Sequence, residues 1–555
     1  MNTKPTIKTF EDKSIIWSNT FEHFKAKVYV PSNDLPGEII NYGYDAPYLI
    51  VFEEHEHDFD GAKAYADATG LADIAIEYDS SVVFVYPTAD GGWDNADEEL
   101  YKELIANSKI HEYHENGYAI LNNRFTGKCD GYAIRGAIFR VDLFGTGKAA
   151  DYIATKLIKN IRGEGLWGPA VITPTVCTLC NLNVTPVIER TDMPIVSIGN
   201  SDSVNEYLHT KAESVYEESV SATSSGTNSI GLTTDFSSAY RQFIRRFIRW
   251  GWEGELQYAP DFEELGMIRE PAVITVKTSE DNCGDYRDTA EHPLGYLAYY
   301  NKGIFDNGPV PLVMCFHGGG DSAMHIAQVS GWYKVAHDHN FLLVCTENHL
   351  NSTATESMEL LEHLLGKYNI DKTAIYSTGF SMGGCKTWDL YQEYPETFAG
   401  MAPMDATFDV GFNLYGQKLS KEYNQDITVP VFYAGGEATP LPELPFQEQK
   451  CLDRMAYVLR VNKCTSDYNV SLSDKDNWAN PIWGIDGNRV EKIYDESRQS
   501  TLTIQYFDSA PGQCYSAFAS ISDQGHECRY HTCEYAWRFI SRFRRMPDGT
   551  LKVLQ

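Results

Sequence analysis

Residues 374–384 read Ala-Ile-Tyr-Ser-Thr-Gly-Phe-Ser-Met-Gly-Gly. The first residues have the composition of a buried strand, and residues 385–394 have that of a helix. Between them, Gly379 and Gly383 stand two residues either side of Ser381. This spacing is typical of a tight strand-to-helix turn, the nucleophile elbow, which exposes a serine hydroxyl above the edge of a sheet. The sequence therefore predicts that Ser381 is a nucleophile.

The elbow belongs to a chain segment in which apolar runs and helical patterns alternate. The runs cover residues 310–316, 341–345, 373–376 and 429–433, and a helical pattern covers residues 356–368. Such alternation predicts an α/β fold, a mostly parallel sheet flanked by helices.

The N-terminal half repeats the same pattern of strands in the same order. Residues 47–52 match 311–316, residues 81–86 match the 341–345 strand, residues 137–147 lie over the elbow strand, and residues 193–199 lie over 429–435. Internal repeats of this kind predict two similar domains in tandem. We place them at residues 1–257 and 258–555.

A glycine-rich segment follows the strand that ends at residue 316. It reads His317-Gly318-Gly319-Gly320, and glycine allows the backbone to turn its N–H groups toward a ligand. The N–H groups of Gly318, Gly319 and Met382 are the predicted oxyanion hole, because Met382 directly follows the nucleophile.

A serine nucleophile requires a base and an orienting acid, in the chain order serine, acid, histidine. His526 is the predicted base, and His531 is the alternative. Glu437, at the turn after the 429–433 strand, is the predicted acid, and Glu443 is the second candidate. We interpret His317 as a residue that shapes the oxyanion loop.

The N-terminal half lacks the corresponding groups. In the aligned repeats, Gly145 occupies the position of Ser381, and Glu53 and Glu54 fall where the other half has its histidine and first glycine. Ile230 falls over the predicted base. The carboxylates of Glu53 and Glu54 would repel a developing oxyanion, so we expect this half to be inert in acyl transfer.

These residues resemble the α/β-hydrolase superfamily, and in particular its polyhydroxybutyrate depolymerase and feruloyl esterase-like esterases. The likeness covers most of residues 270–545 and rests on the His-Gly-Gly segment, residues 330–333, the elbow, and Gly525-His526 before an aromatic terminal helix. It implies two tandem α/β-hydrolase-like domains, the first degenerate. Such esterases usually have an aspartate where this chain offers Glu437.

Composition limits the partners. The 555 residues hold 46 basic and 77 acidic side chains, a formal charge of −31, which repels nucleic acids and anionic membranes. No apolar run is long enough to span a membrane, and the start lacks the apolar core of a signal peptide, so we expect a cytoplasmic protein. The 12 cysteines are sparse, and Cys177 and Cys180 have no second pair at metal spacing.

We therefore expect a serine carboxylic-ester hydrolase that needs no metal or organic cofactor. Its expected substrate is a small or oligomeric ester, feruloyl, acetyl or hydroxyalkanoate in type. The two domains are expected to form an intramolecular pseudo-dimer, and a homo-oligomer is possible. The alternatives are a serine peptidase or amidase on the same fold, and a binding protein without enzymatic activity.

Overall fold

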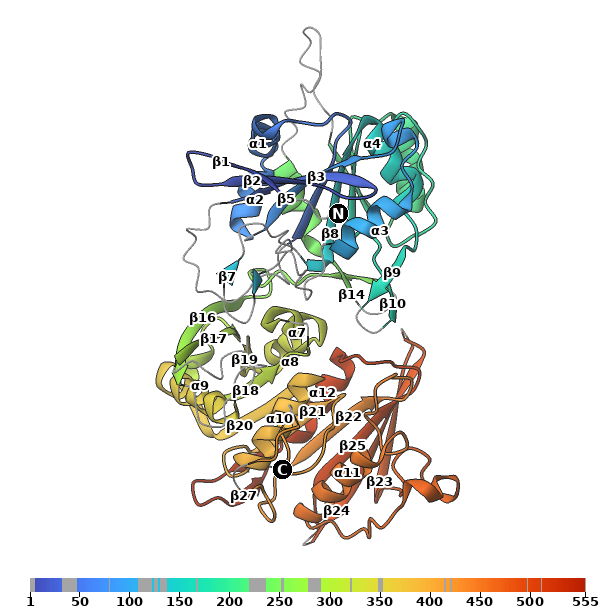
Figure 1. The fold of residues 1–555 in the computed structure, drawn as a ribbon. Helices are drawn as coiled ribbons and strands as arrows, with labels where there is room; N and C mark the ends of the chain where they lie inside the picture. Colours follow the sequence, from blue (N-terminus) through green and yellow to red (C-terminus); the bar gives the residue numbers. More distant parts are fainter. Residues whose placement is uncertain are drawn as a thin grey trace. The chain divides into compact units, whose positions relative to one another are not determined.

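The computed structural model describes residues 5–31, 47–78, 80–107, 122–123, 128–129, 137–165, 168–218, 236–250, 254–277, 291–319, 322–347, 353–413, 416–419, 422–496, 498–510 and 512–554. The chain divides into two compact units, Met1–Asp261 and Phe262–Gln555. The sequence repeats place the division four residues earlier, after residue 257. Each unit has one large mixed sheet with helices beside it (Figure 1).

The sheet of the N-terminal unit has the strand order β1-β2-β3-β5-β4-β8-β11-β12-β13. Its strands are β1 (Thr6–Thr9), β2 (Ile15–Thr20), β3 (Phe24–Val30), β4 (Pro47–Phe52), β5 (Ser81–Pro87), β8 (Ala137–Thr146), β11 (Val176–Cys180), β12 (Pro194–Ile198) and β13 (Ser214–Glu218). The helices are α1 (Phe59–Ala68), α2 (Leu71–Glu77), α3 (Glu98–Asn107), α4 (Gly147–Tyr152), α5 (Asp202–Lys211) and α6 (Phe236–Gln242). Short pairs are β6 (Asn122–Asn123) with β7 (Lys128–Cys129), β9 (Arg162–Gly165) with β10 (Gly168–Val171), and β14 (Phe247–Trp250) with β15 (Glu255–Tyr258).

The sheet of the C-terminal unit has the order β16-β17-β19-β18-β20-β21-β22-β25-β24-β23. Its strands are β16 (Met267–Lys277), β17 (Glu291–Asn301), β18 (Val310–Phe316), β19 (Leu342–Thr346), β20 (Ile370–Phe380), β21 (Gly400–Met404), β22 (Val431–Gly436), β23 (Arg489–Asp495), β24 (Ser500–Ser509) and β25 (Gln513–Ile521). The helices are α7 (Ala323–Val329), α8 (Trp332–His339), α9 (Ala354–Lys367), α10 (Met382–Glu393), α11 (Gln449–Val461) and α12 (Tyr530–Ile540), and a hairpin of β26 (Phe543–Arg545) and β27 (Leu551–Val553) follows.

The central strands of both sheets run parallel, as the alternation of strands and helices predicts. They are buried on both faces because helices cover both sides. In the C-terminal unit, the buried faces of α9, α10 and α11 share one core with the sheet. Aromatic rings also pack beside α8 and α12. The ring of Phe341, which follows α8, lies 4.2 Å from the ring of Trp537 on α12, measured between centroids.

The two units share their strand order. The series β3-β5-β4-β8-β11-β12-β13 in the first corresponds to β17-β19-β18-β20-β21-β22-β25 in the second. Both units thus have an α/β-hydrolase-like fold, and two such units in succession along the chain fit a tandem of domains. In the part of the chain that the structure describes, no helix has the length and apolar character needed to cross a membrane.

Candidate active site

Ser381 lies on a strained turn between β20 and α10. Its φ is +54° and its ψ is −121°, a backbone conformation that residues other than glycine rarely adopt. The turn is tight enough to exclude other residues at its flanks: a Cβ on Gly383 would lie 2.0 Å from the carbonyl oxygen of Phe316, and one on Gly379 would lie 2.2 Å from the carbonyl oxygen of Gly383. This geometry is that of a nucleophile elbow.

His526 faces the serine from the loop between β25 and α12. Its Nε2 lies 2.8 Å from Oγ of Ser381, and its ring packs on Phe380 with 4.7 Å between ring centroids. The imidazole is nearly buried, with 8% of the side chain exposed. Nε2 is therefore placed to accept the serine proton.

Glu443, not Glu437, meets the other side of the imidazole. Oε1 of Glu443 accepts a hydrogen bond from Nδ1 of His526 and another, of 3.0 Å, from Oγ1 of Thr439. Gln447 holds the loop, since its amide oxygen accepts from the N–H groups of Glu443 and Leu444, each at 2.8 Å. An acceptor at Nδ1 fixes the tautomer in which Nε2 carries no proton.

The placement of Glu437 corrects the acid that the sequence favours. The backbone N–H of Glu437 donates to the carbonyl of Ile521 at 2.9 Å, so the chain still runs beside β25 at this point. Its carboxylate accepts from Oγ of Ser520 at 2.7 Å. Only after the turn at residues 438–442 does the chain return toward His526, which is why the second candidate, Glu443, reaches the ring.

The remaining histidine candidates lie elsewhere. Nδ1 of His531 is 3.9 Å from Asp495 at the end of β23. His317 is buried in the loop after β18, with Nδ1 2.7 Å from the carbonyl oxygen of Gly318 and Nε2 3.6 Å from Glu347. Glu347 in turn accepts from the N–H of Ala323 at 2.7 Å. His317 thus has the surroundings of a residue that shapes its loop.

The predicted oxyanion residues lie together at the elbow. The Phe316 and His317 carbonyls lie against Gly383, because a Cβ there would be 2.0 Å and 2.6 Å from them. A Cβ on Gly319 would lie 2.6 Å from Sδ of Met382, so that glycine lies on the Met382 side chain. Met382 is also the first residue of α10, where backbone N–H groups have no acceptor within the helix. Gly320 lies outside the described residues.

Burial governs the charge state of the acid. Glu443 is buried, and loss of solvent raises the pKa of its carboxyl above the usual range, while hydrogen bonds from Asp405 and Thr439 act in the opposite direction. Asp405, directly after β21, is a neighbour of the site that the sequence did not indicate. A charged residue immediately after a fully buried strand was the available signal.

The strand register identifies the matching position in the N-terminal unit. Gly145 pairs with Phe52 as Gly379 pairs with Phe316. Gly145 is therefore the counterpart of Gly379, and Gly147 is the counterpart of the nucleophile. The sequence alignment of the two halves, which matched Gly145 with Ser381, is therefore shifted by two residues.

Carboxylates fill that site in the N-terminal unit. A Cβ on Gly147 would lie 2.6 Å from Oε2 of Glu54, and Glu53 beside it is buried. His57 lies 3.7 Å from Glu53. In the described ranges, His, Cys, Asp and Glu side chains do not gather in threes as a metal site requires. Ile230, aligned with His526, lies outside the described residues.

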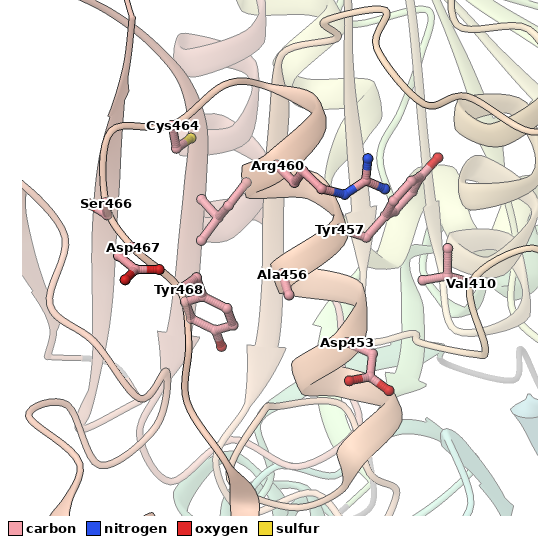
Figure 2. A pocket seen from close by; sticks show the side chains of 10 residues that line it. Val410, Asp453, Ala456, Tyr457, Arg460, Cys464, Ser466, Asp467 and Tyr468 are labelled. Carbon is pink, nitrogen blue, oxygen red and sulfur yellow. The ribbon is translucent and has the colours of Figure 1, made fainter.

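A pocket of ≈ 500 Å³ opens on α11 rather than at the serine. Figure 2 shows side chains of this helix between the following loop and Val410. The lining residues are Val410, Asp453, Ala456, Tyr457, Leu459, Arg460, Cys464, Ser466, Asp467 and Tyr468. Ser381, His526 and Glu443 are not among them, so we assign the pocket no part in the site.

Comparisons with known proteins add likenesses of fold. No family model and no curated protein matches the chain. Among solved structures, it is similar to an acetyl xylan esterase from Aspergillus awamori (12% identity, TM-score 0.33, 48% of this chain and 98% of that one). It is also similar to a mutant feruloyl esterase module from Clostridium thermocellum complexed with sinapinate. The identity is 14%, the TM-score is 0.30, and the match covers 51% of this chain and 91% of the module. The match to a thermostable esterase (22%, 0.25) covers 34% of this chain and only 52% of the esterase. At these scores the fold assignment rests on the strand order and the elbow.

Proposed function

We propose that the C-terminal unit is a serine carboxylic-ester hydrolase. The observation that carries this proposal is the 2.8 Å contact between Oγ of Ser381, on its strained turn, and Nε2 of His526, whose other nitrogen faces Glu443. A nucleophile, a base and an orienting acid in this order are the requirements of acyl transfer through a covalent intermediate.

The reaction follows from the positions of these groups. Oγ of Ser381 attacks the ester carbonyl carbon while Nε2 of His526 takes the hydroxyl proton, and negative charge develops on the carbonyl oxygen. The N–H groups of Met382, Gly318 and Gly319 are proposed to bind that oxygen. As the bond from carbon to the leaving oxygen breaks, His526 returns the proton and the alcohol departs.

Water completes the cycle. It gives a proton to His526 and attacks the acyl-enzyme, and the acid product leaves as Ser381 recovers its proton. Throughout, Glu443 holds the imidazole and stabilises its cationic form. The residues of this site can carry out each step with their own side chains and backbone groups.

The proposed substrate is a small or oligomeric ester without strong negative charge. The chain's formal charge of −31 disfavours polyanionic substrates at low ionic strength. Feruloyl, acetyl and hydroxyalkanoate esters are the substrates we would test. We propose that the N-terminal unit takes no part in the chemistry, because carboxylates occupy its equivalent of the oxyanion site.

A panel of p-nitrophenyl and feruloyl esters, run beside peptide anilides, tests the proposal. We expect ester turnover that exceeds amide turnover and that Ser381→Ala abolishes. Amide turnover without ester turnover would instead establish a peptidase or amidase. Absence of both, together with an unreactive serine, would leave a binding protein.

A further inference from the structure

A second carboxyl group lies behind the acid of the proposed triad. Asp405 follows β21 and Glu443 follows the neighbouring strand β22, and the two carboxyl groups lie close enough for each to change the pKa of the other. Both residues are buried, with 3% and 1% of their surface exposed. The N–H of Gly436 donates to Oδ1 of Asp405 at 3.1 Å, which fixes the aspartate side chain.

Two buried carboxyl groups in contact cannot both be ionised, because like charges at this distance repel strongly where water is excluded. One proton must therefore lie between them. The surroundings decide which group carries it. Glu443 receives hydrogen bonds from His526 and Thr439 on Oε1, which favours a negative charge there.

Asp405 has fewer stabilising contacts for a charge. Burial, and next the charge of Glu443, raise the pKa of Asp405 well above its usual range. Oε2 of Glu443 is buried and has no other hydrogen-bond donor among the described residues. A proton on Asp405 supplies the donor that this oxygen needs.

We propose that Asp405 is a positioning residue that keeps a proton and donates it in a hydrogen bond to Glu443, so that Glu443 stays ionised and aimed at His526. This inference rests on the proposed function for its kinetic consequences only. The proton itself, and the hydrogen bond it makes, are properties of the folded protein.

Titratable groups on four elements lie near the pair. His526 faces it from the loop after β25, Tyr433 lies on β22, Cys451 on α11 and Cys533 on α12. Among these side-chain types, histidine is the one whose unperturbed pKa lies near neutral pH. At higher pH the pair loses its shared proton, and two facing carboxylates replace one oriented acid.

The N-terminal unit indicates which substitution the backbone accepts. Asp405 has φ +49°, and its counterpart Asn181, which follows β11, has φ +53°. Asparagine is thus compatible with this turn, and its amide can donate to Glu443 and accept from Gly436 as a protonated carboxyl does. Glycine also tolerates the positive φ but removes the side chain.

The test compares Asp405→Asn, Asp405→Gly and the control Glu437→Gln, whose carboxylate accepts a hydrogen bond from Ser520 rather than from His526. With p-nitrophenyl acetate near neutral pH, we expect kcat/KM of Asp405→Asn and Glu437→Gln within about threefold of wild type. For Asp405→Gly we expect kcat to fall about tenfold or more with little change in KM. Asp405→Asn should also stay active to higher pH than wild type.

Infrared spectroscopy detects directly whether the carboxyl group of Asp405 carries a proton. Because Asp142 is also a buried carboxyl with a raised pKa, the spectrum to use is the difference between wild type and Asp405→Asn at about pH 7, which should contain the carbonyl stretch of one buried carboxylic acid. A difference spectrum without that band, or an Asp405→Asn variant as impaired as Asp405→Gly, would overturn the proposal. If the wild type turned over no ester, the proposed function would fail while the infrared result still decided the state of Asp405.

Discussion

Gly147 and Ser381 occupy the same position in the two sheets. Each residue follows the central strand, each precedes or opens a helix, and their φ angles are +53° and +54°. The backbone of the elbow is therefore present in both units, while the hydroxyl is present in one. Where the C-terminal unit has the glycines of the proposed oxyanion hole, the N-terminal unit has the carboxylate of Glu54 beside Gly147.

Restoring the hydroxyl alone should not restore a site in the N-terminal unit. In a Ser381→Ala background, we expect Gly147→Ser to remain unlabelled by a fluorophosphonate probe, because the adjacent carboxylate opposes negative charge on the phosphonyl oxygen. Mass spectrometry of the treated protein provides the measurement. Labelling at residue 147 would contradict the view that this unit is inert.

Glu443 and Glu437 provide a matched pair of substitutions. Glu443→Gln should lower kcat about 1,000- to 10,000-fold, because an amide facing Nδ1 no longer holds the imidazole in the productive tautomer. Glu437→Gln should change kcat less than about threefold, since its partner is Ser520. Steady-state kinetics on one ester are sufficient, and the reverse ranking would show that the acid is misassigned.

Two glycines in the C-terminal unit should respond to alanine in opposite directions. At Gly383 a Cβ would lie 2.0 Å from the Phe316 carbonyl oxygen, whereas at Gly366, exposed on α9, it would meet nothing within 4 Å. Gly383→Ala should lower the free energy of unfolding by at least about 2 kcal/mol and impair turnover.

Gly366→Ala serves as the control and should raise the free energy of unfolding by about 0.5 to 1 kcal/mol, because alanine favours the helix. Denaturant titration measures both variants. A Gly383→Ala protein with wild-type stability and activity would show that the elbow does not pack against the loop after β18 as described.

Asp142 on β8 predicts a pH dependence of stability in the N-terminal unit. It is buried, and loss of solvent raises its pKa from 3.8 to about 8. Because the folded-state pKa exceeds the unfolded value, the folded state binds more protons, and stability falls as pH rises from about 4 to about 8.

Asp142→Asn removes that dependence, since the amide resembles the protonated carboxyl and is neutral in both states. We expect little change in unfolding free energy near pH 4 and a gain of about 2 to 4 kcal/mol near pH 8. Thermal or denaturant unfolding across this range is the measurement. An equal gain at both pH values would mean that ionisation of Asp142 is not the cause.

The sequence was most informative where a motif reflects a local backbone requirement. Ser381 was predicted because its flanking glycines are needed by any such turn, and His526 because it lies after the apolar run 502–507 and before the terminal helix. The structure brings these two side chains into contact. The alternation of strands and helices likewise predicted the α/β fold of both units.

The acid could not be predicted because its position depends on the path of a loop. Glu437 and Glu443 lie on the same connection, and only the hydrogen bonds of Gln447 and the pairing of Glu437 with Ile521 decide which one returns to His526. Leu444, buried directly after Glu443, was a partial signal. Asp405 was missed because its role depends on Glu443, which follows a neighbouring strand and is distant in sequence. Gly147 was missed because the register of the strands, and not sequence similarity, aligns it with Ser381.

The most direct test of the central claim is the reaction of the intact protein with a fluorophosphonate, followed by mass mapping of the labelled peptide. The account predicts one label per chain, on Ser381, and loss of both labelling and ester turnover in Ser381→Ala, the latter on the order of a millionfold. A wild-type protein that hydrolyses esters but carries the label on another residue, or that leaves Ser381 unlabelled, would contradict it.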